Sequence, residues 1–60
     1  MFDIVIKANQ RDSMDRIYLE GYLLGQGIPY RVGRFGDLLA QPNRDQLDQL
    51  IGDGWQIRVL

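Results

Sequence analysis

The segment that most constrains the fold is residues 13–30, SMDRIYLEGYLLGQGIPY, the longest periodic stretch of the chain. Its apolar residues recur three and four positions apart, which is the spacing of an amphipathic helix. We expect this helix to begin between Gln10 and Met14 and to run to about Gly25. Side-chain oxygens suited to an N-cap lie just before it, on Asn9, Asp12 and Ser13.

Two faces of this predicted helix carry apolar residues. On a helical wheel, the broader arc holds Met14, Ile17, Tyr18, Gly21, Leu24 and Gly25. We predict that this arc packs on the core and that its two glycines allow close approach of the helix to a sheet. The opposite arc carries Leu19 and Leu23, bordered by Tyr22, together with charged residues. We expect these three apolar residues to form an exposed patch of the kind that marks a protein interface, against the alternative of a tolerated surface pair.

The helix should end in a glycine stop that is followed directly by a strand. Gly27 is placed to take the left-handed conformation that terminates helices, and Pro29 restricts Ile28 to an extended backbone. Ile28, Tyr30 and Val32 then alternate with polar residues and should face the core.

A hairpin is predicted over residues 32–38, where two glycines bracket a turn. A turn at the first glycine would pair Val32 with Phe35, whereas a turn at the second would pair Phe35 with Leu38. The sequence leaves both registers open, and in either case residues 37–41 form the returning strand. If that segment were coil instead, the sheet would have three strands.

Three further elements complete the pattern. Residues 2–8 alternate as a strand with one buried face, and residues 55–60 do the same at the carboxyl end. Between them, Asn43 with Gln46 three residues later predicts a capping box at the start of a second helix over residues 44–51. Its apolar face should consist of Leu47, Leu50 and Ile51.

The predicted order is therefore β-α-β-β-α-β. Two right-handed crossovers joined by a hairpin give a four-stranded antiparallel sheet in the order 4-1-3-2, with both helices on one face. This is a minimal ferredoxin-like α+β sandwich, and residues 1–60 form a single domain.

A chain of 60 residues buries only about 60% of the surface that it exposes when unfolded, so its core is marginal. Small domains often compensate with disulfides, a metal ion or oligomerisation. The sequence contains no Cys and no His, which excludes disulfides and removes the ligands of a zinc site. Oligomerisation or docking on a larger partner therefore becomes the favoured route, although a compact monomer remains the alternative.

Catalysis has few possible sources in this sequence. The usual general base and the thiolate nucleophile are absent, and no phosphate-binding or dinucleotide-binding glycine pattern occurs. We expect Ser13 to serve as a helix cap and Lys7 to be a solvated strand residue. The chain is thus predicted to be a non-enzyme without metal or cofactor.

Charge argues against a strongly electrostatic partner, because seven basic and eight acidic residues give a net charge of -1. Nucleic-acid binding through the open face of the sheet is the alternative function, with a salt-dependent affinity. That face should present Asp3, Val5, Lys7, Arg31, Gln56 and Arg58, with no aromatic pair among them. The absence of Cys, of a signal peptide and of a stretch of about 20 apolar residues predicts a cytoplasmic protein outside the membrane.

We expect a small protein-interaction module that acts as a homodimer, or as an inhibitor or adaptor docking on a larger protein. Chains of this size without catalytic residues are common among accessory proteins of phages and other mobile elements, which block a host enzyme or defence complex. Tyr and Arg are frequent anchors of protein interfaces. The predicted interface residues are Leu19, Tyr22, Leu23, Arg31, Arg34 and Phe35.

Overall fold

The computed structural model of the chain describes residues 1–8 and 12–60. The predicted Asn9 cap and the earliest predicted helix start, at Gln10, lie outside the described residues. In chain order the elements are β1 (Ile4–Ile6), α1 (Ser13–Gly25), β2 (Tyr30–Val32), β3 (Leu38–Ala40), α2 (Arg44–Gly52) and β4 (Ile57–Val59). The predicted β-α-β-β-α-β order is confirmed, with strands shorter than the alternating sequence segments.

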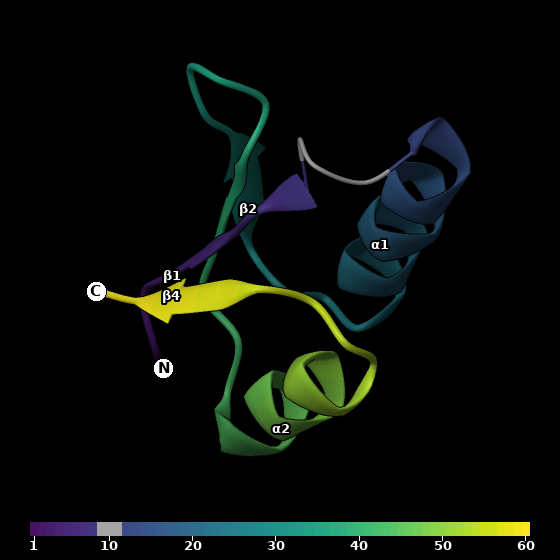
Figure 1. The fold of residues 1–60 in the computed structure, drawn as a ribbon. Helices are drawn as coiled ribbons and strands as arrows, with labels where there is room; N and C mark the ends of the chain where they lie inside the picture. The colour runs from purple at the N-terminus through teal and green to yellow at the C-terminus, as the bar shows by residue number, and fades with distance from the viewer. Residues whose placement is uncertain (9–11) are drawn as a thin grey trace.

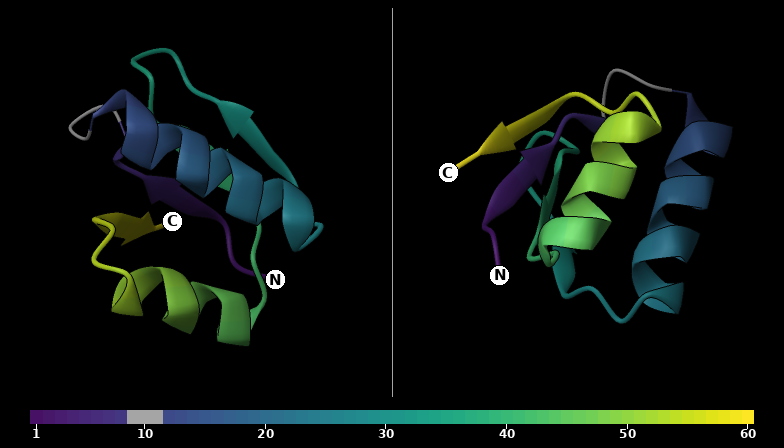
Figure 2. Two further views of the ribbon diagram at one scale, coloured as in Figure 1. Left: turned by 90° about the vertical axis from the view of Figure 1, so that its right-hand side faces the viewer. Right: turned by 90° about the horizontal axis from the view of Figure 1, so that it is seen from below.

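The four strands of the described chain form one antiparallel sheet in the order β2-β3-β1-β4. Both helices lie on the same side of it, as the two turned views in Figure 2 show. This is the ferredoxin-like arrangement that the sequence predicts. The ends of the chain lie near each other at the side of the sheet away from the helices (Figure 1).

The sheet register separates the strand residues into two faces. Ile4 is paired with Ala40 and Ile6 with Leu38 on the two central strands, and all four side chains are buried beneath the helices. The residues between them face the opposite, open side, where Arg31 pairs with Leu39, Leu39 with Val5 and Val5 with Arg58. One face of the sheet is therefore dry and the other is solvated, as in other sheets that carry helices on one side only.

The core of the described residues is small and entirely apolar. It consists of Ile4, Ile6, Ala8, Leu19, Leu23, Ile28, Leu38, Ala40, Leu47 and Leu50. Val32 and Val59 also belong to the helix-facing side of the sheet, but both are more than half exposed. They lie on the edge strands β2 and β4, where the expected burial of the alternating residues is incomplete.

Helix α1 packs with the face opposite to the predicted one. Leu19 and Leu23 are 2% and 0% exposed, so the prediction that they lie on the surface is wrong. Leu19 is the middle residue of the helix, and Leu23 lies one turn further on, so their side chains fill the centre of the contact with the sheet. On the other face the corresponding middle position is Gly21, which offers no side chain to fill that space. A Cβ added at Gly21 or Gly25 would meet nothing within 4 Å, so these glycines do not serve close packing within the monomer.

Both ends of α1 have local causes. Asp12 rather than Ser13 is the N-cap, because its side chain accepts a 2.9 Å hydrogen bond from the Asp15 amide, whereas Ser13 is already helical. At the other end Gly27 has φ +67°, as predicted. The Ile28 amide then donates to the Leu23 carbonyl at 2.9 Å, which returns the buried Ile28 side chain to the core.

Helix α2 begins with the predicted capping box. The Gln46 amide donates to the Asn43 side chain and the Asn43 amide donates to the Gln46 side chain, both at 2.9 Å. Leu47 and Leu50 are buried as expected, but Ile51 is half exposed, so the apolar face is narrower than predicted.

The hairpin between β2 and β3 adopts neither predicted register. Val32 pairs with Leu38, so the loop is longer than either two-residue turn. The Gly33 amide donates to the Asp37 carbonyl and the Gly36 amide to the Gly33 carbonyl. Gly36 has φ +87°, so this is a turn closed by a left-handed glycine, a common longer hairpin loop.

Candidate functional site

The outward face of α1 carries several exposed apolar side chains. Its four large side chains are strongly exposed: Met14 by 63%, Ile17 by 62%, Tyr18 by 76% and Leu24 by 69%. We call this face, with the exposed glycines that lie between and beside these residues, the outer stripe of α1: Met14, Ile17, Tyr18, Gly21, Leu24 and Gly25. Single exposed apolar residues are ordinary on protein surfaces, but a continuous set on one helix face is typical of an interaction site.

The outer stripe replaces the predicted patch on the same helix. Leu19 and Leu23 pack in the core, and Tyr22 is half-buried against it, so the two leucines are not accessible to a partner. The sequence pattern indicates the outer stripe, but the prediction that it packs on the core is wrong. The signal that distinguishes the two faces is the glycine at the centre of one and the leucine at the centre of the other.

The three predicted hairpin residues are exposed but do not form one surface with α1. Arg34 and Phe35 occupy the turn, where Phe35 is largely exposed. Arg31 lies on β2 and belongs to the open face of the sheet, on the side away from the helices. The six predicted interface residues are therefore divided among the core, the hairpin turn and the open face.

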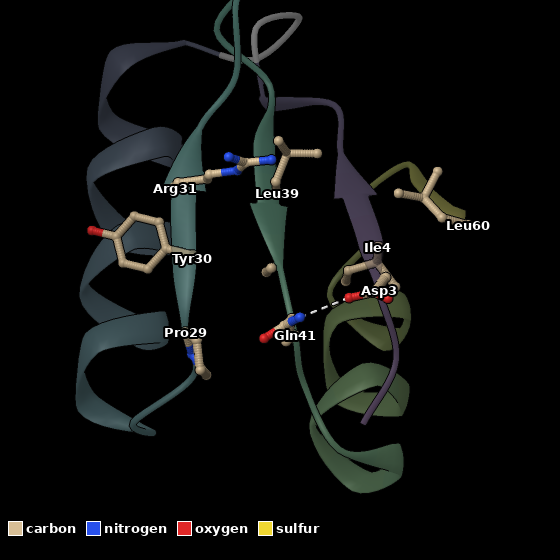
Figure 3. A pocket seen from close by; sticks show the side chains of 9 residues that line it. Asp3, Ile4, Pro29, Tyr30, Arg31, Leu39, Gln41 and Leu60 are labelled. Atoms are coloured by element: carbon tan, nitrogen blue, oxygen red, sulfur yellow. Dashed lines mark hydrogen bonds between the residues drawn. The ribbon is translucent and has the colours of Figure 1, made fainter.

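The open face carries a shallow hollow of about 430 Å³ across β2, β3 and β1. Leu39 lies in it with Arg31, whose side chain extends towards Leu39 in Figure 3. The Gln41 side-chain amide donates to a carboxylate oxygen of Asp3 at 2.8 Å and closes one end of the hollow. The central row of this face is Arg31, Leu39, Val5 and Arg58, which provides two guanidinium groups but no aromatic surface on which a base could stack.

A second hollow, of about 320 Å³, lies where α1 and α2 meet the segment before β4. Three aromatic residues line it, Tyr18 and Tyr22 from α1 and Trp55 from the segment after α2. Two carboxylates, Asp15 and Asp53, also line it, and the remaining lining residues are Leu19 and Leu50. We call this the interhelical hollow. No single segment of the sequence reveals it, because its residues come from positions 15–22 and 50–55.

Among the residues that the structure describes, no group of three or more acidic side chains is positioned to hold a metal ion. Nor is any helix in that part of the chain long and apolar enough to cross a membrane.

The chain matches no family model, no curated protein and no solved structure.

Proposed function

We propose that the chain is a non-enzymatic protein-interaction module that forms a homodimer through the outer stripe of α1. The observation that carries this proposal is the exposure of four large apolar side chains on one face of a single helix. Fully burying one such side chain contributes about 1.5–3 kcal/mol. In the isolated chain this contribution is largely lost. The loss is significant because the core of a 60-residue domain is small.

The glycines of the outer stripe favour a second helix as the occupant. Glycine inside a helix costs about 1 kcal/mol relative to alanine, and no contact within the monomer requires Gly21. Without a side chain at this position, the backbone of a partner helix can approach closely. Close approach of a partner helix thus accounts for glycine at position 21, whose cost to the helix no contact within the monomer explains.

The outer stripe is also sterically complementary to itself. In an antiparallel helix pair with a two-fold axis at Gly21, Ile17 of one protomer lies opposite Gly25 of its partner, and Tyr18 lies opposite Leu24. A large side chain thus meets a glycine, and an aromatic ring meets an aliphatic side chain. Two-fold interfaces of this kind, in which the same surface serves both subunits, are the commonest in soluble oligomers.

The available area sets the expected affinity. A standard interface buries about 800 Å² per partner, close to one fifth of the 4140 Å² surface of this chain. A 13-residue helix is about 20 Å long, so one helix face with its borders supplies an interface at the lower end of that range. We therefore expect a dissociation constant in the micromolar range rather than the nanomolar range.

The test is sedimentation velocity over a range of chain concentrations. The wild type should shift from monomer to dimer, and Ile17→Glu should raise the dissociation constant at least about tenfold by placing a charge in an apolar contact. Ile51→Glu is the matched control, because Ile51 is a half-exposed isoleucine on the other helix. A wild type that stays monomeric at every concentration contradicts the homodimer.

The remaining form of interaction module, an inhibitor or adaptor bound to a larger protein, is tested with the same variants. A partner that binds the wild type and Ile51→Glu but not Ile17→Glu would use the outer stripe. A partner that binds all three equally would not.

A further inference from the structure

The interhelical hollow brings together aromatic rings and a carboxylate, and of these residues only Tyr18 also belongs to the proposed homodimer contact. Tyr18, Tyr22 and Trp55 supply three ring systems, and Asp53 supplies a carboxylate that is exposed to solvent. Of the lining residues in the described part of the chain, none is basic. A hollow with aromatic walls and an exposed carboxylate is suited to an organic cation, because the faces of the rings attract positive charge and the carboxylate accepts its hydrogen bonds.

We infer that the interhelical hollow binds a guanidinium group, presented as an arginine side chain by a partner protein. A guanidinium is planar, stacks on aromatic faces and makes paired hydrogen bonds to a carboxylate, so it can use both parts of the lining. An ammonium is more strongly hydrated and has no flat face, so it gains less from the rings. The volume of about 320 Å³ also accommodates the aliphatic stem of the side chain.

The carboxylate that a guanidinium would engage is that of Asp53, the C-cap residue of α2, which is exposed to solvent. Asp15, in the first turn of α1, already has a partner within the chain. The Oδ1 atom of Asp53 accepts from the Gln49 side chain at 3.5 Å, a long contact that a guanidinium could readily replace.

The inference deepens the proposed function by naming the chemistry of a partner, but its test does not depend on dimer formation. Tyr18 belongs to both the outer stripe and the hollow, whereas Ile17 does not line the hollow. Cation binding can therefore be measured in the Ile17→Glu background, where the proposed dimer is disabled. Failure of the dimer and failure of the cation site are then separate results.

The chain contains a single tryptophan, Trp55, so its fluorescence reports directly on the hollow. The probe is N-acetyl-arginine amide, titrated at constant ionic strength into the Ile17→Glu chain. We expect a saturable change in Trp55 emission with a dissociation constant on the order of 1 mM. N-acetyl-citrulline amide is the matched neutral ligand, because it keeps the planar group and the stem but carries no charge, and it should produce no saturable change.

Asp53→Asn should weaken binding of the arginine derivative at least about threefold, because the charge is lost while an acceptor oxygen remains. Asp48→Asn is the control with the same change of net charge on the same helix, and Asp48 lies outside the hollow in an ion pair with Arg44. Equal responses to the arginine and citrulline derivatives would overturn the inference, as would equal effects of the two asparagine variants. Tighter binding of tetramethylammonium than of the arginine derivative would overturn the assignment to an arginine side chain and identify a small quaternary ammonium ligand instead.

Discussion

Leu19 and Ile17 are two positions apart on α1 and lie on opposite sides of it, Leu19 in the core and Ile17 in solvent. Both sides of the helix are apolar, but only one of them is used by the fold. The unused side is the basis of the proposed function. Several properties of the chain should follow from this division.

Leu23 and Leu24 are adjacent and chemically identical, but only Leu23 is buried. We expect Leu23→Ala to lower the free energy of unfolding by about 3 kcal/mol, the typical cost of removing a buried leucine side chain. A core of this size rarely supplies more than about 3–5 kcal/mol of stability. Much of the Leu23→Ala chain should therefore be unfolded before urea is added, and little of the cooperative transition should remain. Leu24→Ala should change the free energy by less than about 0.5 kcal/mol. Urea unfolding at low chain concentration measures both, and equal effects would mean that α1 is rotated relative to this structure.

The sequence predicts the order of the elements well because each element carries its own local signal. Alternation identifies the strands, the Asn43–Gln46 pair marks the start of α2, and Gly27 marks the end of α1. No such local signal determines which side of α1 faces the sheet. The side depends on what lies under the middle of the helix, and a wheel with apolar residues on both sides does not contain that information.

The hairpin register and the interhelical hollow cannot be predicted from the sequence, for related reasons. The turn register depends on Gly36 adopting a left-handed conformation, and two glycines in one short segment make the position of the turn ambiguous. The hollow requires Tyr18 to lie near Trp55, residues separated by 37 positions in sequence. Only tertiary packing produces that proximity.

The capping box of α2 should contribute measurably to stability. Asn43→Ala removes the oxygen that accepts from the Gln46 amide and should cost about 1 kcal/mol. Asn43→Asp keeps an acceptor at the same place, so its free energy of unfolding should differ from that of the wild type by only about a few tenths of a kcal/mol. In thermal unfolding the alanine variant should melt about 4–8 °C lower. Equal melting of the two variants would show that the cap contributes nothing.

Gly36 should tolerate no side chain without a conformational cost. With φ at +87° it lies in a region that residues with a Cβ rarely adopt. Gly36→Ala should therefore destabilise the chain by about 1–2 kcal/mol, while Arg34→Ala in the same turn should have little effect. Chemical denaturation compares them, and a neutral Gly36→Ala would contradict the turn described here.

Gly21 allows stability and association to be separated. Gly21→Ala should stabilise the monomer by about 0.5–1 kcal/mol, because alanine is the better helix former and its Cβ meets nothing within 4 Å. The same substitution should weaken dimerisation, since the added methyl group lies where the two helices approach each other. Unfolding at low concentration and sedimentation at high concentration measure the two effects. Unchanged or tighter association would indicate that helices do not meet at Gly21.

The most direct test of the outer stripe as a dimer interface uses the absence of cysteine from the natural sequence. In the Gly21→Cys variant, the two new thiols of a dimer with its axis at Gly21 face each other. The added side chains weaken the reversible dimer, as in Gly21→Ala, but a disulfide formed under mild oxidation traps the dimer each time it forms. Ile51→Cys, on the exposed side of α2, is the control for random collision. We expect Gly21→Cys to give a covalent dimer much faster than Ile51→Cys, and we expect the addition of Ile17→Glu to remove the difference. Equal and slow cross-linking of the two single-cysteine variants would contradict the proposed dimer interface.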